Sequence, residues 1–157
     1  MVTRGEIFAV VFLLGTVVGA NLGSAGERPS KGRGTGVVTS VCNGNVCTNH
    51  EEGTYIATHV GRSTYVSDST TVFSTPFCGS VSGSTVLTAA NGDQSFNDFE
   101  DDICFDGSLG VYSGTYTVTG GTGRFSDATG SGTISGTLDC SVLPCIDSIS
   151  NEGTGDY

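Results

Sequence analysis

Residues 110–139 read GVYSGTYTVTGGTGRFSDATGSGTISGTLD, and this stretch decides the fold. In its first part the side chains alternate, so that Tyr112, Tyr116 and Val118 fall on one face while serine and threonine fall on the other. The alternation returns over residues 133–138. A period of two with one apolar face is typical of a half-buried antiparallel strand. Glycines between the two parts favour a tight turn, so the stretch predicts antiparallel strands joined by short connections.

The remaining sequence repeats this pattern of short β-branched runs and turn residues. Asn-Gly pairs at Asn43 and Asn91 are strong signals for tight turns, and turn signals follow about every ten residues. No apolar repeat with the helical period is present. We predict one all-β domain over residues 35–150 with about eight antiparallel strands, arranged as a barrel or a sandwich, and a polar tail at residues 151–157.

Residues 1–20 have the features of a signal peptide. Arg4 precedes a nearly all-apolar run at residues 7–18, which is too short to span a bilayer comfortably, and small residues follow. We expect cleavage after residue 20, with Ala25 as the alternative site, and an uncleaved membrane anchor is the competing interpretation. Cleavage would produce a secreted or otherwise extracytoplasmic protein with a mobile, glycine-rich N-terminus at residues 21–34.

Composition restricts the partners of the protein. The sequence has a formal net charge of −10, and charged residues make up only 14% of it. This charge disfavours nucleic acids and anionic membrane surfaces, because their phosphates would repel the protein. It permits cations and neutral ligands. We therefore expect no nucleic-acid partner, and no membrane partner after signal cleavage.

The six cysteines predict disulfides, since an even number in a small exported domain is typical of a disulfide framework. Sequence alone allows 15 pairings of six cysteines. Proximity favours the pairs Cys42–Cys47 and Cys140–Cys145, and it leaves Cys78 with Cys104. A zinc site is the weaker alternative, because the pairs are separated by four residues and no paired histidines accompany them.

Three segments resemble a group of exported bacterial proteins of unassigned function. They are residues 57–62 (ATHVGR), 87–93 (LTAANGD) and 118–130 (VTGGTGRFSDATG). The third is also similar to the Gly-Gly-Thr-Gly-x-Phe turn of the allene oxide cyclase and dirigent barrels. The resemblance covers about residues 55–139, and these positions carry it: Gly120, Gly121, Thr122, Gly123, Phe125 and Gly130. It implies an eight-stranded antiparallel β-barrel with a largely apolar interior, and in that superfamily often a homotrimer.

The resemblance transfers no catalytic residue. The cyclases work with a glutamate and polar groups inside the barrel. In this sequence Glu51, Glu52 and Glu100 lie in loop-like stretches. With two histidines, no Ser/His/Asp set can be assembled, and no nucleophile-elbow pattern is present. We therefore predict no catalytic residue and no cofactor.

Five residues are candidates for binding a ligand. His59 and Arg62 lie at the end of a predicted strand, where they could orient a ligand at the mouth of a barrel. Tyr112 and Tyr116 could form a cavity wall, and Arg124 could close one end of the cavity. Each residue also has a structural interpretation: a hydrogen bond at a strand end, packing in the core, or an ion pair that holds a turn.

Residues 97–106 (NDFEDDICFD) form the densest acidic segment, which we expect to be a loop or an edge strand. A weak surface calcium site is one interpretation. The spacing does not match the twelve-residue calcium loop, so a solvated segment without metal is favoured.

The pattern favours a secreted, non-enzymatic β-barrel that binds a small apolar or aromatic ligand, or steers its coupling as dirigent proteins do. One alternative is a structural or adhesive protein of the cell envelope, whose hydroxyl-rich outer face would meet proteins or glycans. Another is a cyclase or isomerase that acts inside the barrel. The sequence does not name the ligand.

Overall fold

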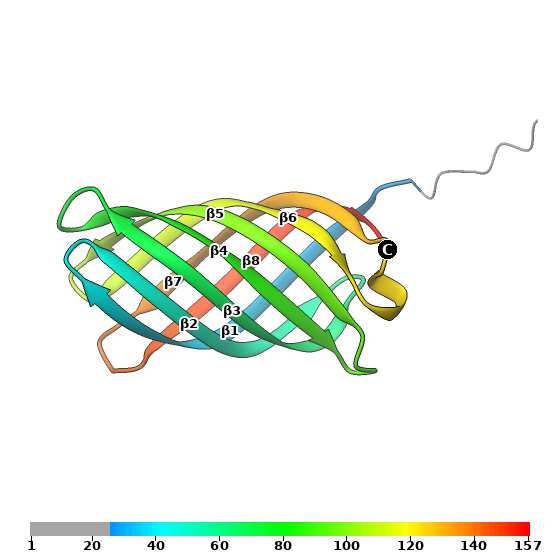
Figure 1. Cartoon of the computed structure of the whole chain (residues 1–157), viewed down its shortest axis with the longest axis horizontal. Coiled ribbons are helices and arrows are strands. Elements are labelled where there is room, and N and C mark those ends of the chain that lie inside the picture. Colours follow the sequence, from blue (N-terminus) through cyan, green and yellow to red (C-terminus); the bar gives the residue numbers. More distant parts are fainter. Residues whose placement is uncertain (1–25) are drawn as a thin grey trace, which may run out of the picture.

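A computed structural model describes residues 26–157, so the predicted signal peptide at residues 1–20 lies outside the described residues. The chain forms a closed antiparallel barrel in which every strand pairs with the next and β8 pairs with β1 (Figure 1). The elements are β1 (Arg28–Asn43), β2 (Val46–Ala57), β3 (Gly61–Phe73), β4 (Cys78–Ala89), β5 (Gln94–Asp106), β6 (Leu109–Gly121), the 3-10 helix η1 (Gly123–Phe125), β7 (Thr129–Asp139) and β8 (Cys145–Asp156). This confirms the predicted eight-stranded antiparallel barrel.

The first and last strands are longer than the sequence predicts. β1 begins at Arg28, inside the segment expected to be mobile, and β8 continues to Asp156, through the expected polar tail. The two segments pair with each other, from Arg28 opposite Gly155 to Val38 opposite Cys145. Closing the barrel requires both strands in full, because an unpaired edge would leave a row of backbone groups without partners.

Glycine and tyrosine alternate around the interior. Gly32 on β1 faces the ring of Tyr55, and Gly136 on β7 faces the phenol of Tyr112; a Cβ at either glycine would overlap the tyrosine. The interior of an eight-stranded barrel is just wide enough for side chains to fill. Large rings therefore fit only where the neighbouring strands contribute no side chain, which explains inward-facing glycines such as Gly32 and Gly136.

One end of the barrel, here the closed end, is filled by side chains. η1 places Phe125 in the barrel end, where it is fully buried (0% exposed). Tyr157 packs against it edge-to-face, with ring centroids 6.1 Å apart, and Val60 and Ala128 are also buried there. Gly123 has φ of 55° in this turn, a conformation that glycine adopts without strain.

The opposite end, here the disulfide end, carries three disulfides. Cys42–Cys47 and Cys140–Cys145 each close a hairpin, and Cys78–Cys104 joins β4 to β5. These are the pairs that the sequence favours. Disulfides persist in oxidising environments, which indicates an extracytoplasmic location. Among residues 26–157, no helix has the length and apolar character needed to cross a membrane.

Candidate functional site

A cavity of about 330 Å³ occupies the barrel interior. Its wall reaches Leu143 at the disulfide end, where that side chain is 84% exposed, and it extends inward to Tyr55 and Tyr116. The buried Phe125 and Val60 lie beyond it at the closed end. The cavity is therefore a blind pocket that opens at the disulfide end.

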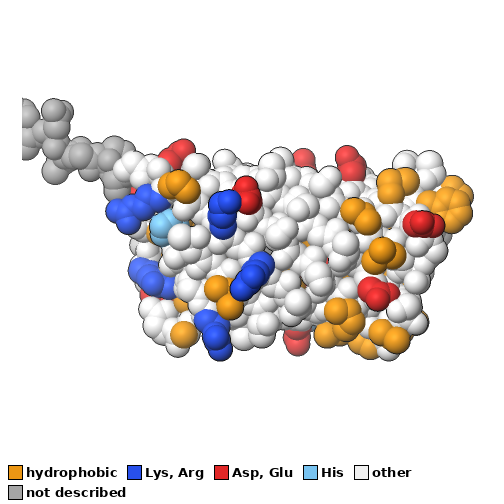
Figure 2. Space-filling view, turned by 180° about the vertical axis from the view of Figure 1, so that it is seen from behind, with side chains coloured by type: hydrophobic (Ala, Val, Ile, Leu, Met, Phe, Trp, Pro, Cys, Tyr) orange, Lys and Arg blue, Asp and Glu red, His pale blue; other side chains and the backbone are white. Residues whose placement is uncertain are grey.

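The mouth of the pocket is apolar. Phe73 and Phe105 line it from β3 and β5, with ring centroids 6.2 Å apart. Exposed apolar side chains gather around the outside of the same end, which is the right-hand end in Figure 2. They include Val41, Phe77 and Val142. An entrance of this composition favours passage of an apolar group over that of an anion or a sugar.

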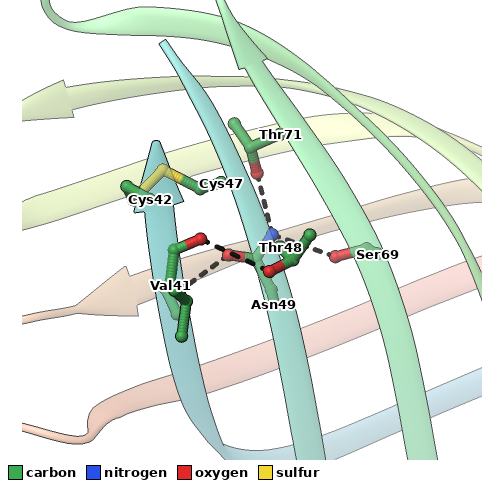
Figure 3. Close-up of a disulfide and its surroundings, with 8 residues drawn as sticks. Val41, Cys42, Cys47, Thr48, Asn49, Ser69 and Thr71 are labelled. Carbon is green, nitrogen blue, oxygen red and sulfur yellow. Dashed lines mark hydrogen bonds between the residues drawn. A yellow bond between two sulfur atoms is a disulfide. The ribbon is translucent and has the colours of Figure 1, made fainter. Parts of the chain in front are cut away.

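A layer of hydroxyl and amide groups lies just inside the mouth, next to the Cys42–Cys47 disulfide (Figure 3). Asn49 Nδ2 donates to Ser69 Oγ at 3.1 Å and to Thr71 Oγ1 at 2.9 Å. Ser40 Oγ donates to Asn49 Oδ1 at 2.7 Å. These groups hydrogen-bond one another across β1, β2 and β3, so the layer is already organised before a ligand binds.

Two carboxyl groups and two phenols meet deeper in the pocket. Glu51 on β2 accepts a hydrogen bond from the hydroxyl of Tyr65, and Asp147 Oδ2 on β8 accepts one from the hydroxyl of Tyr112 at 3.0 Å. Burial raises the pKa of Glu51, and it also raises the pKa of Asp147, which the negative charge of Glu51 raises further. Glu51 therefore favours the protonated form of Asp147.

A third carboxyl, that of Asp101 on β5, lines the same pocket. Burial raises its pKa to about 7, and the negative charge of the neighbouring Asp102 acts in the same direction. Burial raises the pKa of the Tyr112 phenol, and the negative charge and hydrogen bond of Asp147 and the negative charges of Glu51 and Asp101 act in the same direction. Deprotonation of Tyr112 is therefore disfavoured in this acidic part of the pocket.

No basic side chain balances these acids in the pocket lined by the described residues. All five lysines and arginines of residues 26–157 lie in the segments nearest the closed end, namely the first part of β1 (Arg28, Lys31 and Arg33), the start of β3 (Arg62) and η1 (Arg124). On the face shown in Figure 2, the basic side chains gather in the left-hand half. Within residues 26–157, no group of three or more His, Cys, Asp and Glu could hold a metal ion. The pocket therefore combines an apolar mouth with an acidic interior.

No family model matches the chain, and no match was found among curated proteins or solved structures. The resemblance to allene oxide cyclase and dirigent barrels stays a hypothesis that rests on the residues quoted for it. In the structure, the glycine turn that carries the resemblance forms the closed end around Phe125. That turn therefore plays a structural part, and it contributes nothing to the pocket wall.

Of the five predicted ligand-binding residues, only the two tyrosines line the pocket. His59 lies in the β2–β3 turn at the closed end, where its Nε2 is 3.1 Å from the carbonyl of Pro29. Its ring also lies on that of Tyr157, 5.1 Å between centroids. Contacts of this kind hold the closed end together.

The two predicted arginines also lie away from the pocket. Arg62 is exposed on the outer face of β3. Arg124 donates from its guanidinium to the carbonyl of Val60 at 2.9 Å and lies over the ring of Phe125, 4.5 Å from its centroid. Arg124 therefore stabilises the filling of the closed end.

The acidic residues of the pocket are the ones that sequence reasoning missed. Glu51 was expected in a loop, but it lies within β2 on the same face as Tyr55. Asp101 belongs to the acidic segment that was expected to be a loop or an edge strand, and it lies within β5 on the inner face with Phe99. The period of two could have found both residues, because each is separated from its aromatic neighbour by an even number of positions.

Proposed function

We propose that this protein is a secreted, non-enzymatic β-barrel that binds a small apolar or aromatic ligand, or steers the coupling of such a ligand. The blind pocket with an apolar mouth is the observation that carries the proposal. Ligand pockets are mostly apolar clefts of about 300–1,000 Å³ that contain a few polar groups. The pocket, at about 330 Å³, lies at the lower end of that range, which suits a small aromatic compound or a short chain.

A fluorescent probe tests this proposal. Neutral N-phenyl-1-naphthylamine gains fluorescence when it enters an apolar pocket, and small aromatic compounds that share the pocket should displace it. Val81 lines the pocket on β4, and its neighbour Ser82 is exposed on the outer face. Val81→Trp should abolish the signal by filling the pocket, whereas Ser82→Trp should leave it unchanged. Equal signals from the two variants would contradict binding inside the barrel.

A cyclase or isomerase is the second candidate, and the placement of Glu51 favours it. The resemblance implies a glutamate inside the barrel, and Glu51 lies there with Tyr65 and Asp147. Burial and the charge of Glu51 raise the pKa of Asp147 to about 8, so this neighbouring carboxyl can give or take a proton near neutral pH. The test is turnover of an unsaturated fatty-acid epoxide, read as product stereochemistry. Racemic product from the unmodified protein, matching the product formed without protein, would rule this candidate out.

A homotrimer is part of the proposal, since the resemblance implies one. Sedimentation equilibrium of the oxidised protein without its first 20 residues measures the assembly directly. A single species with the mass of one chain would rule out the proposed trimer and leave the binding proposal unaffected.

A further inference from the structure

We infer that the ligand carries a positive charge, and that the buried carboxyls of Asp147 and Asp101 bind an organic ammonium group on an apolar or aromatic stem. This inference rests on the proposed binding function and narrows it to one chemical class. Asp101 lies on β5 and Asp147 on β8, both line the pocket, and Asp147 accepts a hydrogen bond from the phenol of Tyr112.

Both aspartates contain an oxygen without a protein partner. Asp147 is 2% exposed and Asp101 is 7% exposed, and Oδ1 of each makes no hydrogen bond. Both residues line the pocket. A buried carboxylate oxygen without a partner costs free energy, so groups of this kind normally have a hydrogen-bond donor or an opposite charge nearby. Here the pocket is the place from which a donor can come.

The pocket also lacks a counter-charge. Three carboxyls face it, and its lining contains no lysine, arginine or histidine. Buried charge is tolerated where it is paired and hydrogen-bonded. An ammonium group has one positive charge and up to three donors, which matches the unpartnered oxygens of Asp147 and Asp101. The positive charge of the ligand would thus form an ion pair with a negative charge that the protein provides.

The site suits an organic cation better than a metal ion. Within the described residues, no group of His, Cys, Asp and Glu could hold a metal. Side chains around the acids include those of Tyr65, Phe99 and Ile134, which offer apolar and aromatic surface to a stem. Aromatic faces also attract a cation that lies against them. We therefore assign an arylalkylamine or a similar primary amine as the class of ligand.

The position of the positive charges supports the same conclusion. The lysines and arginines of the described chain lie toward the closed end, away from the entrance. A cation that approaches the disulfide end would therefore meet little repulsion from the protein, and the overall net charge of −10 would attract it. An anion of the same size would be repelled both outside and inside the pocket.

A matched pair of probes tests the inference. 2-Phenylethylamine and 2-phenylethanol share a stem, and only the amine is charged. Calorimetric titration at pH 8.5 should give an amine affinity about tenfold or more above that of the alcohol, as expected for a hydrogen bond between charged groups. At this pH Asp101, whose pKa is about 7, is ionised in the free protein. The amine affinity should fall on going to pH 6, because Asp101, with a pKa of about 7, and Asp147, with a pKa of about 8, take up protons over this range.

Two variants and one control locate the charge. Asp147→Asn and Asp101→Asn should each lower the affinity for the amine. Each should therefore reduce the difference in affinity between the amine and the alcohol. Asp98→Asn changes an exposed carboxyl on the outer face of β5, so it should leave both affinities unchanged. The comparison on the unmodified protein remains decisive if a variant fails to fold.

The outcomes separate the inference from the proposed function. Equal affinities for amine and alcohol, or binding of neutral N-phenyl-1-naphthylamine without binding of the amine, would overturn the inference and leave the binding function in place. Failure of all three compounds to bind would overturn both. An amine affinity that Asp98→Asn lowers as much as Asp147→Asn would place the cation on the outer surface, which also overturns the inference.

Discussion

Tyr112 donates its hydroxyl to Asp147 Oδ2 at 3.0 Å, and this bond joins two strands that are not neighbours, β6 and β8. β7 lies between them and contributes Gly136 at the position opposite Tyr112. The phenol passes over this glycine to reach the carboxylate, since a Cβ there would overlap the ring. One hydrogen bond in the acidic part of the pocket therefore depends on a missing side chain.

Gly136→Ala should destabilise the barrel. The new Cβ would overlap the phenol of Tyr112 and the carbonyl oxygen of Ser148, and the backbone cannot give way without breaking pairing with β8. Overpacking of this kind costs about 1–3 kcal/mol. Urea unfolding measures the loss. Ser135→Ala, at the preceding exposed position, is the control and should change the stability by less than about 0.5 kcal/mol.

Tyr112→Phe should raise the pKa of Asp147. The hydroxyl of Tyr112 stabilises the charged form of this carboxyl, so its removal leaves desolvation and the charge of Glu51 less opposed. The pKa is measured by NMR titration of the labelled carboxyl carbon. A pKa that stays constant or falls would mean that the phenol does not donate to Asp147.

Asp101→Asn should make the protein less sensitive to pH. The pKa of Asp101 rises from an ordinary value near 3.8 to about 7 in the folded protein. Between these values the folded state holds a proton that the unfolded state has lost, so stability falls as the pH rises toward 7. A tenfold change in an acid dissociation constant corresponds to about 1.4 kcal/mol, so a pKa that rises from 3.8 to about 7 corresponds to about 4 kcal/mol. We expect Asp101→Asn to recover about half of this at pH 8, because the buried amide of asparagine also costs free energy.

Thermal unfolding of the two proteins at pH 5 and pH 8 measures this effect. The gain from Asp101→Asn should be larger at pH 8 than at pH 5. Asp98→Asn on the outer face of the same strand is the control, and it should behave as the unmodified protein does. A gain in stability that is larger at pH 5 than at pH 8 would show that the folded protein stabilises the charged form of Asp101.

Removing the Cys78–Cys104 disulfide should cost more than removing Cys42–Cys47. The sequence separations are 26 and 5 residues, and a longer loop loses more entropy in the unfolded chain when it is closed. The chain-entropy relation gives about 3.5 kcal/mol for the first and about 2 kcal/mol for the second. Denaturant unfolding of the two double Cys→Ser variants compares them. A larger loss for Cys42–Cys47 would contradict the loop-entropy account.

The sequence predicts the fold where its two faces differ in polarity. In β6, Tyr112, Tyr116 and Val118 alternate with serine and threonine, and the structure confirms them as the inner face. In β1 the inner residues from Ser30 to Gly36 are serine and glycine, so there is no contrast with the polar outer face. The sequence therefore predicts a strand that begins only at residue 35. Residues 28–34 belong to β1 because they pair with β8, and their own pattern does not show this.

The acidic part of the pocket was hidden for the same reason. Glu51 and Asn49 point inward, and His50 and Glu52 point outward, so polar residues occupy both faces of β2. Composition then suggests a loop. Counting by two from Tyr55 places Glu51 inside, and this geometric rule holds whether or not the face is apolar. The partnership of Asp147 with Tyr112 joins strands far apart in the sequence, and no local pattern indicates it.

The start of β1 and the last residue, Tyr157, both lie at the closed end of the barrel, opposite the entrance (Figure 1). A fluorescent protein or a surface tether joined after Tyr157 by a flexible linker would therefore leave the disulfide end facing free solution. Immobilised barrels could be exposed to a stream of candidate compounds with every entrance accessible. The topology thus makes the molecule suitable as a sensor, because the attachment point and the entrance of the pocket are at opposite ends of the barrel.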